Sequence, residues 1–259
     1  MHAIINIALR AAREASDLIV QATDRLDRVQ VFRKGINDYV TNIDQDVEAL
    51  LIAAIQKAYP EHGFVGEESG TIEGEDKSTV WYIDPIDGTR NFMRGFPHFC
   101  ISMACVKNNK LEHAVILDPI RQDEFTATRG EGSRLNGSRI RVGTSDSLKE
   151  AVVSLSCASG DHFDKALSLQ GKLHNNVAGL RVTGSAALDL AYVACGRLDA
   201  GWVSGIKLWD VAAGMLLIQE AGGLISDHQG NPDCLHSDNL IFSNPKCFKS
   251  LLKVIHTNQ

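Results

Sequence analysis

The segment WYIDPIDGTRNF, residues 81–92, constrains this chain most, because an apolar strand pattern stops abruptly in acidic and turn-forming residues. Pro85 cannot donate to a strand ladder, and it biases Asp84 toward an extended backbone. Strict strand alternation would send Asp84 and Asp87 to opposite faces. We therefore predict that Pro85 ends the strand and turns the chain, so that both carboxylates and the Ile86 carbonyl converge on one pocket.

Gly88 and Thr89 come next, directly before a predicted short helix in GTRNFMRG. Backbone N–H groups at a helix start favour a bound phosphate group. Several carboxylates beside an anion require cations between them, since like charges repel at short range. Oxygen ligands favour magnesium. The open alternative is that Asp-Pro-Ile-Asp-Gly forms an ordinary turn, for which its residues are well suited.

Three further acidic segments accompany this one. The sequence GEES, residues 66–69, ends a predicted short strand, and Asp44 lies in the first turn of a helix predicted to begin near residues 41–42 and to stop at Pro60. Asp210 follows Trp209 at the start of an apolar helix pattern. Taken singly, each acidic residue is more typical of a solvated loop or a helix first turn. Only their combination with residues 81–92 suggests a site.

The remaining periodicity predicts a mixture of helices and strands. Apolar spacing predicts a helix over residues 3–24, polar loops over 34–39 and 70–78, and an antiparallel meander over 99–142. The second half alternates strand patterns (AVVSLSC, LRVTG, DAGWVSG, GGLISDH, NLIFSN) with helix patterns. No linker is long enough to separate two domains. The class is therefore mixed α and β, with layered helices and sheets.

Composition and charge indicate the cellular compartment and the kinds of partner to expect. The chain has 259 residues, 44% of them hydrophobic, and a formal net charge of -6, which argues against broad binding to nucleic acid or anionic membrane. The N-terminal segment lacks the unbroken apolar core of a signal peptide, and no apolar run reaches the roughly 18 residues of a membrane span. The six cysteines form no CxxC pair. These features predict a cytoplasmic protein with reduced cysteines, no membrane contact and no direct nucleic-acid binding.

Four motifs in a fixed order resemble the inositol monophosphatase family, particularly its bacterial members. They are GEES at 66–69, WYIDPIDGTRNF at 81–92, the turn GSAA at 184–187 and WDVAAG at 209–214, and they span most of the chain. The resemblance implies an α+β fold, a single domain over residues 1–259 in which helix and sheet layers alternate (α-β-α-β-α). It also implies a lithium-sensitive, magnesium-dependent phosphatase that forms a homodimer.

The same resemblance implies the metal ligands. Glu67, Asp84 and the Ile86 carbonyl would hold one magnesium ion. Asp84, Asp87 and Asp210 would hold a second, and a third, weaker ion would lie near Glu67.

The resemblance also implies the residues that act on the substrate. Backbone N–H groups of residues 88 and 89 would bind phosphate oxygens, and the turn at 184–186 would face the alcohol. Thr89 and Glu67 would orient a metal-activated water for attack on phosphorus, with Asp44 supporting Thr89 or the outer metal shell. The predicted substrate-binding residues are Asp87, Gly88, Thr89, Gly184, Ser185, Ala186 and Asp210.

The predicted reaction is hydrolysis of a small phosphate monoester, with inositol 1-phosphate as the leading substrate. Val203 lies seven residues before Asp210, where family members that act well on inositol phosphates often carry a glutamate that contacts substrate hydroxyls. Valine cannot accept such hydrogen bonds, which leaves open histidinol phosphate, a nucleotide 3′-phosphate or a sugar bisphosphate. Some bacterial family members also join RNA-processing or transcription complexes, so a regulatory protein-binding role is the remaining alternative.

Overall fold

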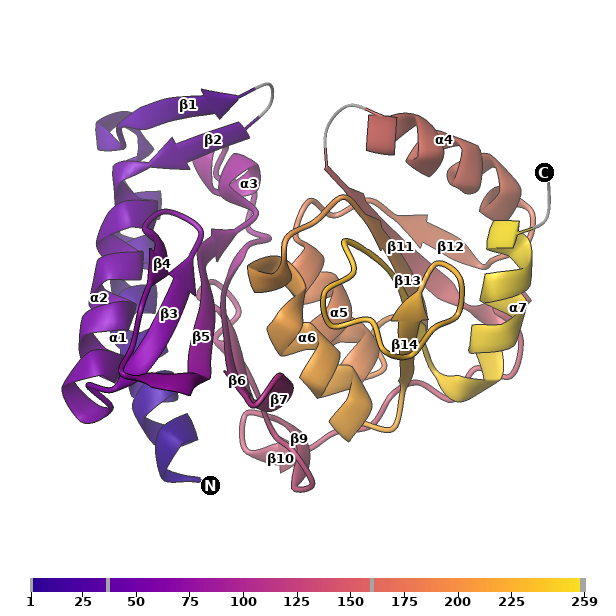
Figure 1. Ribbon diagram of the computed structural model, residues 1–259. Helices are drawn as coiled ribbons and strands as arrows, with labels where there is room; N and C mark the ends of the chain where they lie inside the picture. Colours follow the sequence, from indigo (N-terminus) through magenta and orange to yellow (C-terminus); the bar gives the residue numbers. More distant parts are fainter. Residues whose placement is uncertain (1, 36–37, 159–160, 257–259) are drawn as a thin grey trace.

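The protein is built from five alternating layers of helices and sheets (Figure 1). The computed structural model describes residues 2–35, 38–158 and 161–256. Helices α1 (Ala3–Thr23) and α2 (Asn42–Ala58) form the first layer, α5 (Ala186–Ala194) and α6 (Leu208–Glu220) the middle one, and α4 (Asp161–His174) and α7 (Pro245–His256) the last. One sheet lies in each gap between helix layers. The predicted α+β class with alternating layers is confirmed, and the domain boundary at residues 1–259 stays a prediction.

The first sheet has eight strands in the order β10-β9-β8-β7-β6-β5-β3-β4. Its meander is the predicted one, and the pair β3–β5 is parallel. The predicted loop at 70–78 is wrong, because β4 and the start of β5 lie there; an edge strand needs no apolar alternation to pair its backbone. The strands are β3 (His62–Gly66), β4 (Gly70–Ile72), β5 (Asp76–Asp87), β6 (Cys100–Lys107), β7 (Lys110–Asp118), β8 (Asp123–Thr128), β9 (Gly132–Leu135) and β10 (Ser138–Arg139).

A separate hairpin precedes α2. Strands β1 (Val31–Gly35) and β2 (Asp38–Thr41) pair antiparallel, so the prediction of a polar loop over 34–39 is wrong at both ends; residues 36–37 of that loop lie outside the described residues. Most of β1 is exposed, and its residues therefore show no apolar and polar alternation. A short 3-10 turn, η1 (Leu26–Arg28), links α1 to this hairpin.

Strand β5 does not end at Pro85, contrary to the sequence prediction. It continues to Asp87, with a change of register against β6: Asp84 pairs with Ser102 and Asp87 with Cys100. Three steps along β5 therefore match two along β6, which is a β-bulge with one extra residue. Since Ser102 and Cys100 lie on one face of β6, the bulge brings Asp84 and Asp87 to one face as well.

The second sheet has five strands in the order β12-β11-β13-β15-β14. Its strands are β11 (Val152–Cys157), β12 (Gly179–Arg181), β13 (Ala200–Ser204), β14 (Leu224–Asp227) and β15 (Asn239–Ser243). Strand β11 runs parallel to both β12 and β13, so the carboxyl ends of these three strands share one edge. Such an edge is the usual place for a ligand site in a parallel sheet. A 3-10 turn, η2 (Leu148–Glu150), precedes β11.

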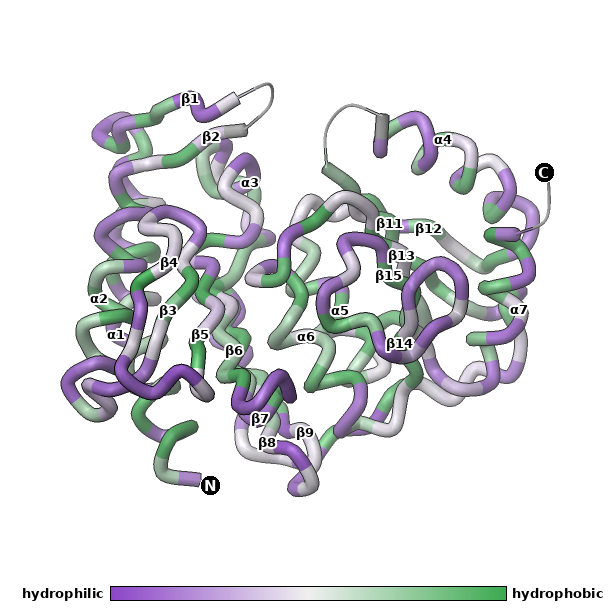
Figure 2. Tube along the Cα trace, in the orientation of Figure 1, coloured by the Kyte–Doolittle hydropathy of each residue, from purple (hydrophilic) through white to green (hydrophobic). Residues whose placement is uncertain are grey.

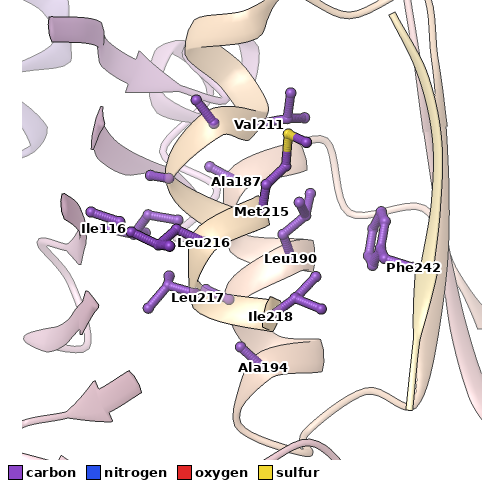
Figure 3. Close-up of a cluster of buried hydrophobic side chains, with 14 of the residues drawn as sticks. Ile116, Ala187, Leu190, Ala194, Val211, Met215, Leu216, Leu217, Ile218 and Phe242 are labelled. Atoms are coloured by element: carbon purple, nitrogen blue, oxygen red, sulfur yellow. The ribbon is translucent and has the colours of Figure 1, made fainter. Parts of the chain in front are cut away.

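Helices α5 and α6 form an apolar centre between the two sheets (Figure 2). Leu216 points toward Ile116 of the first sheet, whereas Leu190 and Ile218 point toward Phe242 of the second (Figure 3). A helix buried on all sides has no polar face, which explains the nearly continuous apolar sequence of α6. This packing fixes the start of α6 between the sheets. Within the described part of the chain, no helix is long and apolar enough to cross a membrane.

Candidate active site

A pocket of about 880 Å³ opens between the two sheets, at the carboxyl edge of β11 and β13. The predicted acidic residues Glu67, Asp84, Asp87 and Asp210 all line it. The other predicted residues that line it are Ile86, Gly88, Thr89, Gly184 and Ala186. Segments far apart in sequence therefore meet at one cavity, as the motifs predict.

Asp84 lies at the β5 bulge and is buried. Its Oδ1 accepts a hydrogen bond from the Ile86 N–H at 2.9 Å, which stabilises the local backbone. Burial, followed by the negative charges of Glu67, Asp87 and Asp210, raises the pKa of Asp84 well above its ordinary value. The carboxylates are therefore close enough to repel one another.

Asp87 connects the first sheet to α5. Its Oδ2 accepts hydrogen bonds from Ser185 Oγ at 2.6 Å and from the Ala187 N–H at 2.7 Å. Burial raises the pKa of Asp87 to about 6, while these hydrogen bonds act in the opposite direction. Ser185, a predicted substrate residue, is fully buried and caps α5 through Leu188 N–H, so it supports Asp87 from behind.

Asp210 and Glu67 complete the acidic set. Asp210 lies in the first turn of α6 and accepts a hydrogen bond from the Lys207 N–H at 2.8 Å; burial and the charge of Asp87 raise its pKa well above the ordinary value. Glu67 follows β3, and burial raises its pKa to about 7, although Lys34 Nζ, 3.7 Å from Glu67 Oε1, opposes the shift. The pocket therefore favours added positive charge.

Magnesium fits the chemistry of this donor set. All four side chains offer hard carboxylate oxygens, and the Ile86 carbonyl adds a fifth oxygen donor. Among the residues that the structure describes, no three His, Cys, Asp or Glu side chains are already arranged to hold an ion as they stand. The assignment of individual ligands therefore stays a prediction.

Asp44 and Thr89 form a hydrogen-bonded pair at the pocket wall. Asp44 is fully buried in the first turn of α2, where Thr41 caps the helix and the two residues form a capping box. Thr89 Oγ1 lies 3.2 Å from Asp44 Oδ1 and 3.0 Å from the Ile86 carbonyl oxygen, and its proton can be donated to either acceptor. The structure thus brings Asp44 to Thr89 as predicted.

Glu48 belongs to the site but was missed in the sequence analysis. It is buried on α2, and its two carboxylate oxygens accept hydrogen bonds from the Glu68 N–H at 2.9 Å and the Ser69 N–H at 2.7 Å. Gly66 packs so closely over this carboxylate that a Cβ would collide with it. The spacing in the sequence could have revealed Glu48, because it lies one helical turn after Asp44 and therefore on the same, apolar face of α2.

A second buried acid, Asp189, supports the opposite wall and was also missed. It is fully buried on α5 and accepts hydrogen bonds from Ser156 Oγ and Thr183 Oγ1, both at 2.8 Å. Burial raises its pKa to about 7. Because Ser156 lines the pocket and Thr183 precedes Gly184, Asp189 holds two parts of this wall together. In the sequence, Asp189 is the one acidic residue in an otherwise apolar helix pattern, AALDLAYVA, and this pattern could have pointed to a buried acid.

Val203 is not among the lining residues of the pocket, although its position seven residues before Asp210 suggested a place beside the substrate. It lies in β13, is fully buried and packs in the apolar centre with α5 and α6. Gly205, Ile206 and Lys207, which follow β13, line the pocket at this point. The part of the pocket beside the end of β13 therefore has no acidic side chain from that strand, whose described residues are AGWVS.

The layered fold and its acidic, oxygen-only site define proteins of the inositol monophosphatase type. The chain belongs to the inositol monophosphatase family, whose profile matches residues 1–259. It is 49% identical over 261 residues to the Nus factor SuhB of Pseudomonas aeruginosa, covering 98% of this chain and 96% of that protein.

Two solved structures share the fold. The extragenic suppressor protein suhB from Bartonella henselae superposes with a TM-score of 0.97 at 35% identity, covering 100% of both chains. An IMPase from Thermotoga maritima superposes with a TM-score of 0.89 at 34% identity, covering 97% of this chain and 96% of that one. The family predicted from the motifs is thereby confirmed.

Proposed function

We propose that this protein is a magnesium-dependent phosphatase that hydrolyses a small phosphate monoester, with inositol 1-phosphate as the leading substrate. The observation that carries the proposal is the convergence of four acidic side chains, from β5, α6 and the end of β3, on one pocket. Family membership supports the reaction class. Histidinol phosphate, a nucleotide 3′-phosphate and a sugar bisphosphate remain the competing substrates.

Glu67, Asp84, Asp87, Asp210 and the Ile86 carbonyl would hold two magnesium ions, with a third near Glu67. Bound magnesium neutralises phosphate charge and makes water a stronger nucleophile at neutral pH. The high pKa values of the buried carboxylates support this assignment, because a cation relieves their repulsion.

The side chains of this protein would orient the reactants. When Thr89 donates its proton to Asp44, its oxygen can accept a hydrogen bond from the attacking water. The carboxylate of Glu67 would orient the same water from the other side. Backbone N–H groups of Gly88 and Thr89 would bind phosphate oxygens, and Gly184 would face the alcohol.

The test is phosphate release from inositol 1-phosphate, histidinol phosphate and a nucleotide 3′-phosphate, with and without magnesium and with added lithium. We expect magnesium-dependent, lithium-inhibited release led by inositol 1-phosphate. In Asp87→Asn and Asp210→Asn, kcat should fall by about 100-fold or more while circular dichroism stays unchanged. Near-normal turnover of either variant at saturating magnesium would contradict the site.

A second role is supported by the name of a relative. Because the Pseudomonas aeruginosa relative is called a Nus factor, we also propose that this chain binds a transcription or RNA-processing protein. A pull-down with wild type and Asp210→Asn separates the roles, since a protein contact should persist when catalysis is lost. We further propose a homodimer, which light scattering on the purified protein tests; a monomer mass would overturn it.

A further inference from the structure

One side chain, that of Asn91, joins two segments of the active-site wall. Its amide Nδ2 donates hydrogen bonds to the His98 carbonyl oxygen at 2.7 Å and to the Thr183 carbonyl oxygen at 2.9 Å. Asn91 lies on the short helix α3 (Thr89–Met93), beside the N–H groups proposed to bind phosphate. Thr183 directly precedes Gly184, in the turn proposed to face the alcohol. The two protons of one amide therefore link the phosphate side of the pocket to the alcohol side.

The two linked segments touch backbone to backbone. Gly184 has a φ of +84°, and a Cβ added there would lie 3.0 Å from Asn91 Nδ2. Gly88 has a φ of +99°, and a Cβ added there would lie 3.1 Å from the His98 carbonyl oxygen and 3.2 Å from the Gly184 carbonyl oxygen. Glycine is suited to both positions because it adopts positive φ without strain. A shift of either segment would therefore change the shape of the pocket between them.

The turn at residues 183–187 is tied to the first sheet at both of its ends. At one end, Asp87 Oδ2 accepts hydrogen bonds from Ser185 Oγ at 2.6 Å and from the Ala187 N–H at 2.7 Å. At the other end, the Asn91 amide holds the Thr183 carbonyl oxygen at 2.9 Å. Gly184 lies between these ties. Loss of the Asn91 amide would leave the hydrogen bonds of Asp87 to hold the turn from one side.

Asn91 acts through other residues rather than on the substrate. It is not among the lining residues of the pocket, whereas Gly88 and Gly184 are. The Asn91 N–H donates to the Gly88 carbonyl oxygen at 2.8 Å, and the Asn91 carbonyl oxygen accepts from the Phe96 N–H at 2.9 Å. These backbone contacts do not depend on the side chain. A substitution therefore removes the link between the two segments and keeps the backbone contacts of α3.

We propose that Asn91 is a positioning residue: it fixes the Gly184 turn relative to the N–H groups of Gly88 and Thr89, and thereby sets how well the site discriminates between alcohols. The inference rests on the proposed function, because it concerns two parts of one substrate. A misplacement of about 1 Å can lower a rate about 100-fold. When the turn moves relative to the bound phosphate, contacts with the alcohol are lost while phosphate binding persists.

The test compares substrates that share the phosphate and differ in the alcohol: ethyl phosphate has a small one, and inositol 1-phosphate and adenosine 3′-phosphate have larger ones. Asn91→Leu keeps the branched shape without the donors, and Asn91→Ser keeps a hydroxyl that is too short to reach both carbonyl groups. Asn176→Leu is the matched control, because the Asn176 amide also donates to a carbonyl oxygen, that of Lys172 at 2.7 Å, and does not line the pocket. Initial rates with magnesium give kcat and KM, and inhibition by inorganic phosphate measures the phosphate side alone.

In wild type, kcat/KM should favour at least one of the larger substrates over ethyl phosphate. Both Asn91 variants should reduce that preference about tenfold or more, with a raised KM for the larger substrate, while the inhibition constant of phosphate changes less than about twofold. Asn176→Leu should keep the preference. Equal losses on small and large substrates would mean a general effect on the fold and would overturn the inference, as would a wild type without preference.

Hydrogen exchange separates this inference from the proposed function. If wild type releases no phosphate from these esters with magnesium, the proposed function fails, and mass spectrometry of amide exchange still tests the link between the two segments. Peptides that cover residues 182–188 should exchange up to about tenfold faster in Asn91→Ser than in wild type, whereas peptides from β7 and β8 should not change. Unchanged exchange over residues 182–188 would show that Asn91 does not hold the turn.

Discussion

At the scale of single residues, the site depends on acids that are buried and hydrogen-bonded rather than exposed. Glu48 and Asp189 are not among the lining residues of the pocket, yet each holds a separate wall segment through two hydrogen bonds. A buried donor that loses its hydrogen-bond partner costs about 1–3 kcal/mol. We therefore expect substitutions of these two acids to lower activity by displacing the wall segments that they hold.

Glu48→Gln should raise the magnesium concentration needed for half-maximal phosphate release and lower kcat. An amide can accept from only one of the two N–H groups, so the turn at residues 67–69 should lose its fixed position. A magnesium titration of activity measures the change. Asp46→Asn, an exposed change on the same helix, is the control and should behave as wild type. An unchanged magnesium requirement in Glu48→Gln would contradict the role.

Asp189→Asn should flatten the pH dependence of stability between about pH 4 and 7. Burial raises the Asp189 pKa from 3.8 to about 7, so the folded state keeps a proton that the unfolded state has released. The contribution of Asp189 to the free energy of unfolding is therefore fully present below pH 4 and is lost as the pH rises through 7. The loss is on the order of a few kcal/mol at most. Urea unfolding with EDTA, at several pH values, measures the difference; parallel wild-type and variant curves would exclude Asp189 as the titrating group.

At the scale of elements, close packing of α5 against α6 places the acidic end of α6. Gly214 lies where a Cβ would collide with the side chain of Leu190 on α5. The start of α6 cannot move away freely, because both sheets enclose the helix. The packing that stabilises the molecule also positions Asp210.

Gly214→Ala should lower the free energy of unfolding by about 1–3 kcal/mol, because an added methyl forces the two helices apart. Gly171→Ala on α4 is the matched control: no atom lies within 4 Å of its Cβ position, and alanine is the better helix former by about 1 kcal/mol. Urea denaturation should therefore show opposite signs for the two variants. Equal effects would mean that the α5–α6 contact is loose.

At the scale of the whole molecule, the site joins layers that are far apart in sequence. Glu67, Asp84 and Asp87 belong to the first sheet and its loops, whereas Asp210 belongs to the central helix layer. A cation bound by all of them would link these layers in the folded state alone. Metal binding should consequently appear as stability of the entire fold.

Magnesium should raise the melting temperature of wild type, since a ligand at 100 times its Kd adds about 2.7 kcal/mol to the folded state. Asp84→Asn should lose most of this gain, because its carboxylate lies near all three other acids. Differential scanning fluorimetry with magnesium chloride, against potassium chloride of equal ionic strength, measures the effect. Equal magnesium gains in the two proteins would remove Asp84 from the ligand set.

Much of the fold could be predicted from local patterns. The helix over residues 3–24, the α2 start at Thr41 and the meander over 99–142 followed from periodicity and caps, because they depend on neighbouring residues. The β1–β2 hairpin and β4 did not, because β1 and β4 are largely exposed and their sequences therefore show no apolar and polar alternation.

By itself, the sequence determined the order of elements and the motifs that supply the acidic residues. Tertiary structure decided how those residues meet. The bulge that turns Asp84 and Asp87 to one face exists only because β6 pairs with β5, and Glu48 reaches the 67–69 turn only across the α2–β3 contact. Val203 lies in the core and Arg90 at the pocket for the same reason: a side chain's surroundings are set by distant segments, which one-dimensional patterns do not specify.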